Sequence, residues 1–236
     1  MIIPLMQDID QQILFLLNGS DSLFLDAFIT TLTATITWVP LYAAILYLVI
    51  KNHETMPQIV LTIAAAVITV ALTAAITNLI VKPYVARLRP CNDPFIKSLV
   101  DIVIRLPRND YSFFSAHAAN TFSLAVFLSL LIRGRVFTSA IFIWALVNCY
   151  TRLYLGVHYP SDILCGILFG SFVGFCMYVL YLKFYLKIAP QQNFVSSHYT
   201  STGYSVADVN IVINVLILTL IYALIRASVL SFAINT

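Results

Sequence analysis

The feature that most constrains this chain is a stretch of 26 residues, positions 56–81, that contains no Lys, Arg, Asp or Glu. A helix needs about 20 consecutive apolar residues to cross a bilayer, whereas a barrel strand needs only about 10. Across the chain 61% of residues are hydrophobic and 10% are charged, far below the roughly 25% of soluble domains. The sequence therefore predicts a helical membrane protein and excludes a disordered chain, a nucleic-acid binder and a membrane barrel.

Six runs are apolar enough for membrane-spanning helices. They cover residues 23–50, 56–81, 117–132, 136–155, 159–184 and 209–232. The first run is longer than a bilayer requires and contains Pro40, which predicts a tilt or a kink. The third spans only about 24 Å at 1.5 Å per residue, so one of its ends is expected below the membrane surface. We expect an all-α protein with six transmembrane helices in a single domain, residues 1–236.

Two amphipathic stretches outside these runs predict helices that lie on the membrane surface. In residues 6–17 apolar side chains recur at helical spacing among acidic and amide side chains, until Asn18-Gly19-Ser20 interrupts the pattern. In the loop before the third run, residues 95–106 carry an apolar stripe opposite Lys97, Asp101 and Arg105. Both patterns are typical of interfacial helices.

Ionisable side chains are rare in this chain, and six of them fall at the ends of the runs. Burying such groups near hydrocarbon costs several kcal/mol unless they are paired or functional. If the spans alternate in direction, all six lie on the same face of the membrane: Lys82, Arg89, His117, Arg152, His158 and Asp162. Cations at span ends often act only as membrane anchors, but anchors require neither histidines nor fixed intervals. The set therefore predicts a functional site.

The intervals within this set are those of a known family. Six residues separate Lys82 from Arg89-Pro90, five separate Arg152 from His158, and three separate His158 from Asp162. In this respect the chain resembles the type 2 phosphatidic acid phosphatase superfamily, whose motifs are Lys-x6-Arg-Pro, Pro-Ser-Gly-His and Ser-Arg-x5-His-x3-Asp. The resemblance covers about residues 80–165, with the motifs in residues 82–162, together with the six-span layout that membrane members share.

Three positions depart from the family pattern. The second motif reads Phe114-Ser115-Ala116-His117, so that Phe replaces Pro and Ala replaces Gly, and Thr151 stands where the third motif has Ser. Ala still lets the backbone approach a ligand closely. The departures therefore bear on substrate fit more than on activity.

The resemblance implies a role for each motif residue. His158 is expected to attack phosphorus and form a phosphohistidine, Asp162 to orient it, and His117 to protonate the leaving oxygen. The phosphoryl oxygens are then held by Lys82, Arg89, Arg152 and Ser115. With fixed cations in the place that magnesium takes elsewhere, we expect neither a metal nor a cofactor. Zinc bound by the two histidines and the aspartate is disfavoured, because three nearby cations repel a divalent ion.

Other polar residues have less definite roles. Arg87 is a candidate for a substrate headgroup contact, with a helix anchor as the favoured alternative, and Arg226 near the end of the last run is a candidate for a headgroup or an acidic partner. Lys97, Arg105 and Arg108 fit either an anionic headgroup or an interfacial helix. His53 and His198 are expected on the opposite face, in contact with solvent.

The distribution of charge predicts an orientation and a substrate class. The face opposite the motifs carries Lys51, Arg133, Arg135, Lys183 and Lys187, which the positive-inside rule makes cytoplasmic. We expect a multi-pass protein of a bacterial-type inner membrane whose site faces the periplasm or exterior. Its substrate is expected to be a lipid phosphate: undecaprenyl diphosphate, phosphatidylglycerol phosphate or lipid A. A lipid phosphotransferase that uses the same chemistry with an acceptor other than water is the alternative.

Overall fold

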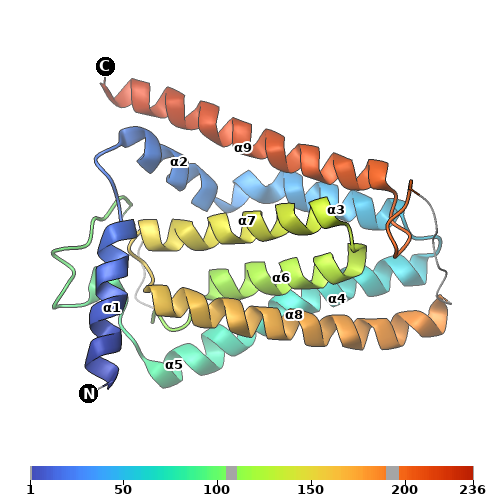
Figure 1. Cartoon of the computed structure of the whole chain (residues 1–236), viewed down its shortest axis with the longest axis horizontal. Helices are drawn as coiled ribbons and strands as arrows, with labels where there is room; N and C mark the ends of the chain where they lie inside the picture. Colours follow the sequence, from blue (N-terminus) through green and yellow to red (C-terminus); the bar gives the residue numbers. More distant parts are fainter. Residues whose placement is uncertain (1, 105–110, 190–196, 236) are drawn as a thin grey trace.

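A computed structural model describes residues 2–104, 111–189 and 197–235 of the chain, which form an elongated bundle of helices (Figure 1). The chain turns back at each end of the bundle, and one short helix crosses the end where the N-terminus lies. The principal helices are α1 (Ile2–Leu17), α2 (Leu23–Thr33), α3 (Val39–Lys51), α4 (Met56–Ala75), α5 (Lys82–Val85), α6 (Ala116–Ile132), α7 (Arg135–Tyr154), α8 (Pro160–Ile188) and α9 (Val206–Asn235).

All six predicted runs are helical, which confirms the all-α class. Four helices are long and apolar enough to cross a membrane: Met56–Val85, Arg135–Tyr154, Pro160–Ile188 and Val206–Ala233. The bent pair α2 and α3 makes a fifth candidate if it is counted as one span, and α6 is a shorter apolar helix of 17 residues. By length and composition, the part of the chain described here thus has four or five candidate spans.

The first predicted run is bent, as expected, but the bend precedes Pro40. The axes of α2 and α3 meet at 67°, with the 3₁₀-helix η1 (Thr35–Trp38) between them. The Thr37 hydroxyl donates to the Thr31 carbonyl at 2.6 Å, and the Trp38 indole donates to the Leu32 carbonyl at 2.8 Å. These bonds satisfy carbonyls that the break leaves without helical partners. Pro40 lies in the first turn of α3, where its missing N–H costs nothing.

The segment from α4 to α5 delivers the first motif to one end of the bundle. The π-helix η2 (Ile76–Val81) joins α4 to α5 without interruption, and Lys82 is the first residue of α5. On the buried side of α4 and η2, the hydroxyls of Thr69, Thr73 and Thr77 each donate to the carbonyl four residues earlier. Their polar atoms are therefore satisfied inside an apolar bundle, as burial requires.

Helices α6 and α8 lie in direct backbone contact because glycines line the contact. A Cβ added at Gly166 would lie 2.8 Å from the Ser115 carbonyl oxygen, and one at Gly170 would lie 2.1 Å from that of Ala119. Gly174 meets the Ser123 carbonyl oxygen in the same way, at 2.3 Å. Small residues at intervals of four let two membrane helices approach closely. This contact fixes the start of α8 against the start of α6.

The helix predicted over residues 6–17 is present, whereas the helix predicted over residues 95–106 is absent from the residues described. Helix α1 crosses the ends of the other helices (Figure 1). Residues 94–99 form turns, and none of residues 93–104 is helical. The Asn18 side chain holds the backbone of Asp101 by accepting from its N–H at 2.7 Å and donating to its carbonyl at 3.0 Å. These bonds replace the i to i−4 bonds of a helix. Arg105, Leu106 and Arg108 lie outside the described residues.

Candidate active site

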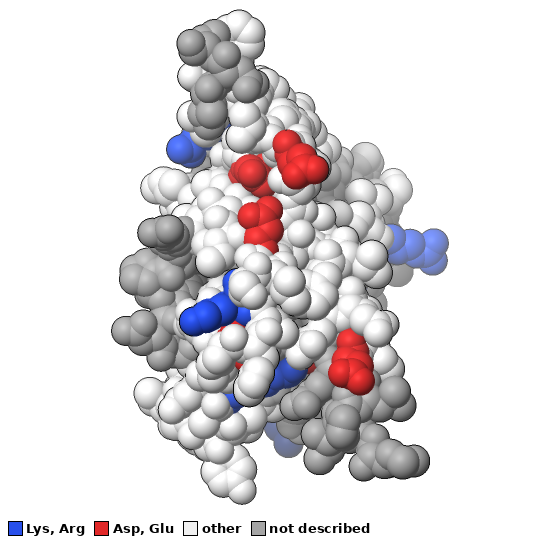
Figure 2. All heavy atoms as spheres, turned by 90° about the vertical axis from the view of Figure 1, so that its left-hand side faces the viewer, with Lys and Arg blue, Asp and Glu red and all other residues white. Residues whose placement is uncertain are grey.

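The motif residues meet at the end of the bundle that α1 crosses (Figure 1). Six segments supply them: the start of α5, the chain after it, the start of α6, the end of α7, the turn that follows α7, and the start of α8. Nearly all are buried, with relative exposures of 6% for Lys82, 1% for Arg152 and His158, and 0% for Arg89, Ser115 and Asp162. Figure 2 looks onto this end, where acidic and basic side chains are scattered among uncharged residues.

The His158 ring lies in the short turn between α7 and α8, between a cation and a carboxylate. The Arg89 guanidinium, which also donates to the Val157 carbonyl at 2.8 Å, lies 3.1 Å from Nε2. On the other side, Nδ1 lies 3.5 Å from Asp162 Oδ2 and 3.4 Å from the Ser112 hydroxyl. A guanidinium only donates, so Nε2 must accept and the ring proton belongs on Nδ1, facing the carboxylate. The geometry thus leaves the Nε2 lone pair on the side of the cations.

The Asp162 carboxylate is held by several donors in the first turn of α8. The Tyr159 backbone N–H donates to Oδ2 at 2.9 Å, and the Ser112 hydroxyl donates to the same oxygen. The Arg87 guanidinium donates to Oδ1 at 2.9 Å. The backbone carbonyl of Asp162 accepts from the Ser115 N–H at 3.1 Å, which ties the second motif to the third. The carboxylate therefore has one defined orientation toward His158.

The charge state of His158 follows from these surroundings. Burial lowers the pKa of the imidazole to about 4; the hydrogen bond and charge of Asp162 oppose this shift, and the charges of Arg89 and Lys82 add to it. Burial dominates because an imidazolium loses its hydration there. The ring is neutral at pH 7, which is the form of histidine that can act as a nucleophile.

The residues around Arg152 explain one departure from the family pattern. Its Nε donates to the Thr151 hydroxyl at 3.1 Å, and its Nη2 donates to the Thr33 hydroxyl at 3.2 Å. The Thr151 hydroxyl itself donates to the Asn148 carbonyl at 2.8 Å. Thr thus supplies the hydroxyl that Ser supplies in the family motif.

The second motif begins α6. Ser115 is the residue that caps this helix, and its hydroxyl accepts from the Ala118 N–H at 3.4 Å. His117 follows in the first turn and is partly exposed, unlike the other motif residues. A helix N-terminus presents free N–H groups and a positive dipole end, which favour an anion. His117 is thus the motif histidine that bulk solvent reaches.

Sequence reasoning missed two residues of this site, Ser112 and Asp10, and did not foresee the contacts of Arg87. The Arg87 guanidinium lies 3.7 Å above the centre of the Tyr159 ring and donates to Asp162, to Ser161 and to Asp10 on α1. Ser112 belongs to none of the motifs, and Asp10 is one of several acids near the N-terminus. Neither had a signal in the sequence, because contacts between distant segments define both.

The other arginine and histidine candidates lie away from this cluster. Arg226 is on an exposed face of α9, a helix whose neighbours are α2, α3 and α7. His198 is exposed, as expected. The expectation that His53 is solvated is wrong: its ring is half-buried, and Tyr185 and Tyr204 pack edge-on against it with centroids 5.8 and 5.7 Å away.

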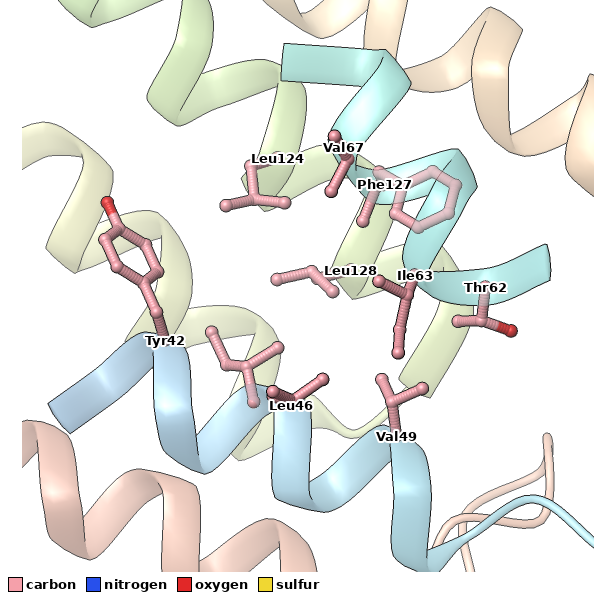
Figure 3. A pocket seen from close by; sticks show the side chains of 11 residues that line it. Tyr42, Leu46, Val49, Thr62, Ile63, Val67, Leu124, Phe127 and Leu128 are labelled. Carbon is pink, nitrogen blue, oxygen red and sulfur yellow. The ribbon is translucent and has the colours of Figure 1, made fainter. Parts of the chain in front are cut away.

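Two cavities lie outside the cluster. One of about 200 Å³ is enclosed by α3, α4 and α6 and is apolar apart from the hydroxyls of Tyr42 and Thr62 (Figure 3). The other, of about 330 Å³, lies beside His53 at the opposite end of the bundle and is lined largely by tyrosines and polar side chains. Neither cavity contains any of the motif residues. Within the described residues, no three His, Cys, Asp or Glu side chains are grouped so that they can hold a metal ion.

Comparison with known proteins identifies the family. The profile of the PAP2 superfamily matches residues 61–186. A lipid A 4′-phosphatase of Bacteroides thetaiotaomicron is 41% identical over 179 residues, which cover 75% of this chain and 79% of the relative. A lipid A 4′-phosphatase of Porphyromonas gingivalis is 30% identical over 175 residues, covering 74% of each chain.

A solved structure shares the fold. The crystal structure of a transmembrane PAP2-type phosphatidylglycerolphosphate phosphatase from Bacillus subtilis superposes with a TM-score of 0.55 at 20% identity, covering 79% of this chain and 89% of that one. Together with the apolar helices, these relatives identify a multi-pass membrane protein. The resemblance indicated by the three motifs is confirmed: the chain belongs to the PAP2 superfamily.

Proposed function

We propose that this protein is an integral membrane phosphatase that hydrolyses the phosphate group of a membrane lipid, with His158 as the nucleophile. The observation that carries the proposal is the state of the His158 ring. Its Nδ1 faces Asp162 at 3.5 Å, and its Nε2 faces Arg89 at 3.1 Å in a buried cluster of cations. A neutral imidazole with its lone pair directed at an anion-binding group suits attack on a phosphoryl group.

The proposed reaction has two displacements at phosphorus. In the first, Nε2 forms a bond to phosphorus as the bond to the lipid oxygen breaks, and His117 gives that oxygen a proton. In the second, water attacks the phosphohistidine, gives a proton to His117 and releases inorganic phosphate. Lys82, Arg89, Arg152 and the Ser115 end of α6 stabilise the charge on the phosphoryl oxygens, the main requirement of phosphoryl transfer. The fixed cations supply this charge without a metal.

Lipid A phosphate is the favoured substrate. The support comes from the two relatives named as lipid A 4′-phosphatases, which match about three quarters of this chain. Undecaprenyl diphosphate and phosphatidylglycerol phosphate also present a terminal phosphoryl group, on other lipids, so they form the comparison arms of the test. The site residues recognise the phosphoryl group, and the remainder of each lipid supplies the discrimination.

The proposed arrangement in the membrane has six spans with the site at the outer surface of a bacterial inner membrane. The bent pair α2 and α3 and the shorter α6 then join the four long helices, and the C-terminus lies at the same end as the site (Figure 1). Five cations at the opposite end support a cytoplasmic location for that end: Lys51, Arg133, Arg135, Lys183 and Lys187. A C-terminal alkaline phosphatase fusion, active only in the periplasm, is expected to be active; an inactive fusion contradicts the orientation.

The decisive experiment measures phosphate release by the purified protein in EDTA, with lipid A, undecaprenyl diphosphate and phosphatidylglycerol phosphate as separate substrates. Lipid A is expected to give the highest kcat/KM. His158→Ala is expected to lose activity by at least about 1000-fold, because no other group in the site replaces the nucleophile. His198→Ala, at an exposed position, is the matched control and is expected to match the wild type.

The outcomes separate the elements of the proposal. Wild-type protein without activity on every lipid, or an active His158→Ala variant, contradicts the function. Loss of activity in EDTA contradicts only the metal-free mechanism. Transfer of phosphate to an added lipid or sugar hydroxyl, in place of release as inorganic phosphate, identifies the phosphotransferase alternative.

A further inference from the structure

Asp10 on α1 is a buried carboxylate outside all three motifs. Its relative exposure is 7%, whereas Asp8 on the same helix is exposed. The carboxylate has three donors: the Ser161 N–H to Oδ1 at 2.8 Å, the Arg87 Nη2 to Oδ2 at 2.7 Å, and the Ser161 hydroxyl to Oδ2. Burying a carboxylate is costly unless it is paired and hydrogen-bonded, so these three donors define the position of Asp10 in the structure.

Arg87 connects this carboxylate to the one in the active site. Its Nη2 donates to Asp10, and its Nη1 donates to Asp162 Oδ1 at 2.9 Å and to the Ser161 hydroxyl at 2.8 Å. The Tyr159 ring lies against the face of the same guanidinium at 3.7 Å. Because a guanidinium is planar and its donors are fixed, the position of Asp10 sets the plane in which Arg87 reaches Asp162.

The effect on Asp162 is specific to one oxygen. Arg87 occupies Oδ1, which leaves Oδ2 as the oxygen that faces His158 Nδ1. Asp10 also accepts from the Ser161 N–H in the first turn of α8, where helix N–H groups lack partners within the helix. It thereby holds both the carboxylate of Asp162 and the start of the helix that carries it.

We propose that Asp10 is a positioning residue of the active site and that α1 belongs to the catalytic unit. Acting through Arg87, it fixes the orientation of the Asp162 carboxylate and thereby the direction of the His158 lone pair. The inference rests on the proposed phosphatase function, and it adds a fourth segment, about 70 residues before the first motif, to the residues on which turnover depends.

The test compares Asp10→Asn with Asp8→Asn, a matched change on an exposed position of the same helix. For Asp10→Asn we expect kcat for lipid phosphate hydrolysis to fall by about 10- to 100-fold, as for loss of a group that orients a catalytic side chain. KM and the inhibition constant of inorganic phosphate are expected to stay within about twofold, because the contacts that the structure describes for Asp10 are with Arg87 and Ser161 and not with the cations proposed to bind phosphate. Asp8→Asn is expected to match the wild type in all three.

A double-mutant cycle tests the route through Arg87. Arg87→Gln alone is expected to lower kcat by more than Asp10→Asn, and the double variant by less than the product of the two single effects. If the two single effects on kcat multiply in the double variant, Asp10 does not act through Arg87. Asp10→Asn with wild-type kcat, or with phosphate inhibition lost as well, overturns the positioning role.

A second variant covers the case in which Asp10→Asn does not fold. Asp10→Glu keeps the charge and moves the carboxylate by one methylene, so kcat is expected to fall by about threefold or more at an unchanged thermal midpoint. Wild-type kcat in Asp10→Glu overturns the inference. Failure of the proposed function is a separate result: in that case the wild-type protein itself hydrolyses no lipid phosphate.

Discussion

Each end of the bundle holds a histidine that is at least partly buried, and the two rings have different partners. At the end that holds the proposed active site, His158 lies between Arg89 and Asp162. At the opposite end, the Nδ1 of His53 lies 2.7 Å from the Val49 carbonyl, and its Nε2 lies 3.2 Å from the Thr62 hydroxyl. The pKa of both imidazoles is lowered, mainly by burial.

Under the proposed function, the difference means that burial alone does not make a histidine reactive. Neutral partners on both nitrogens fix the His53 ring between α3 and α4, and tyrosine rings enclose it. Around His158, by contrast, a carboxylate faces Nδ1 and the Arg89 guanidinium faces the Nε2 lone pair. Charged partners supplied by several segments distinguish a reactive site from a structural contact. Each of the following predictions tests this contrast.

The largest effect is expected when the orienting partner of His158 is changed. Asp162→Asn keeps the size of the side chain but removes the carboxylate that holds the Nδ1 proton, and we expect kcat to fall by roughly 10,000-fold, as in catalytic triads. The measurement is turnover of the favoured lipid by purified protein with an unchanged thermal midpoint. A kcat within tenfold of the wild type contradicts the contrast between His158 and His53, because the charge of Asp162 then contributes little to turnover.

A smaller effect is expected from crowding the contact between α6 and α8 near the site. A Cβ at Gly166 would lie 2.8 Å from the Ser115 carbonyl oxygen, so Gly166→Ala is expected to displace the start of α6 and lower kcat about tenfold. Gly174→Ala crowds the same pair of helices away from the site, 2.3 Å from the Ser123 carbonyl oxygen. It is expected to lower stability by about 1–3 kcal/mol without changing kcat. Equal kcat values for the two variants contradict this prediction.

The pH dependence of the first chemical step tests the charge state of His158. Because burial lowers the pKa of this ring to about 4, the nucleophile stays neutral as pH falls from 7 to 5 and becomes protonated below about pH 4. The rate of phosphoenzyme formation, measured by rapid quench, is therefore expected not to fall over the first range, and to fall about tenfold per pH unit at the lower end. His53→Gln is expected to leave this profile unchanged. A profile that moves in this variant shows that the two ends are coupled.

The smallest effect on activity is expected at the opposite end. Thr62 contacts His53 Nε2 and lies 3.0 Å from the Tyr181 hydroxyl, so Thr62→Val is expected to lower stability by about 1 kcal/mol, the typical contribution of a hydrogen bond. Its kcat is expected to stay within about twofold of the wild type. Thermal unfolding and turnover on the same preparation measure both quantities. A loss of turnover beyond tenfold shows that the contacts of His53 are needed for activity, which contradicts the contrast between the two histidines.

Local patterns in the sequence were sufficient for much of the fold. Apolar runs long enough to cross a bilayer fixed where the helices lie, because a polar backbone in hydrocarbon must form its own hydrogen bonds. The amphipathic pattern of residues 95–106 was misleading, since Asn18 pairs with the backbone of Asp101 from far along the chain. Similarly, Pro40 predicted a kink, but the hydroxyl of Thr37 and the indole of Trp38 stabilise it several residues earlier.

The sequence by itself determined the family and the motif residues, because the spacing of Lys82, Arg89, Arg152, His158 and Asp162 is a local property of two segments. Only the tertiary structure decided which oxygen of Asp162 faces His158 and which residues hold it there. Asp10 lies 77 positions from Arg87, and Arg87 lies 75 positions from Asp162. Such contacts form only when packing brings distant segments together, and a buried carboxylate is stable there only with its partners in place.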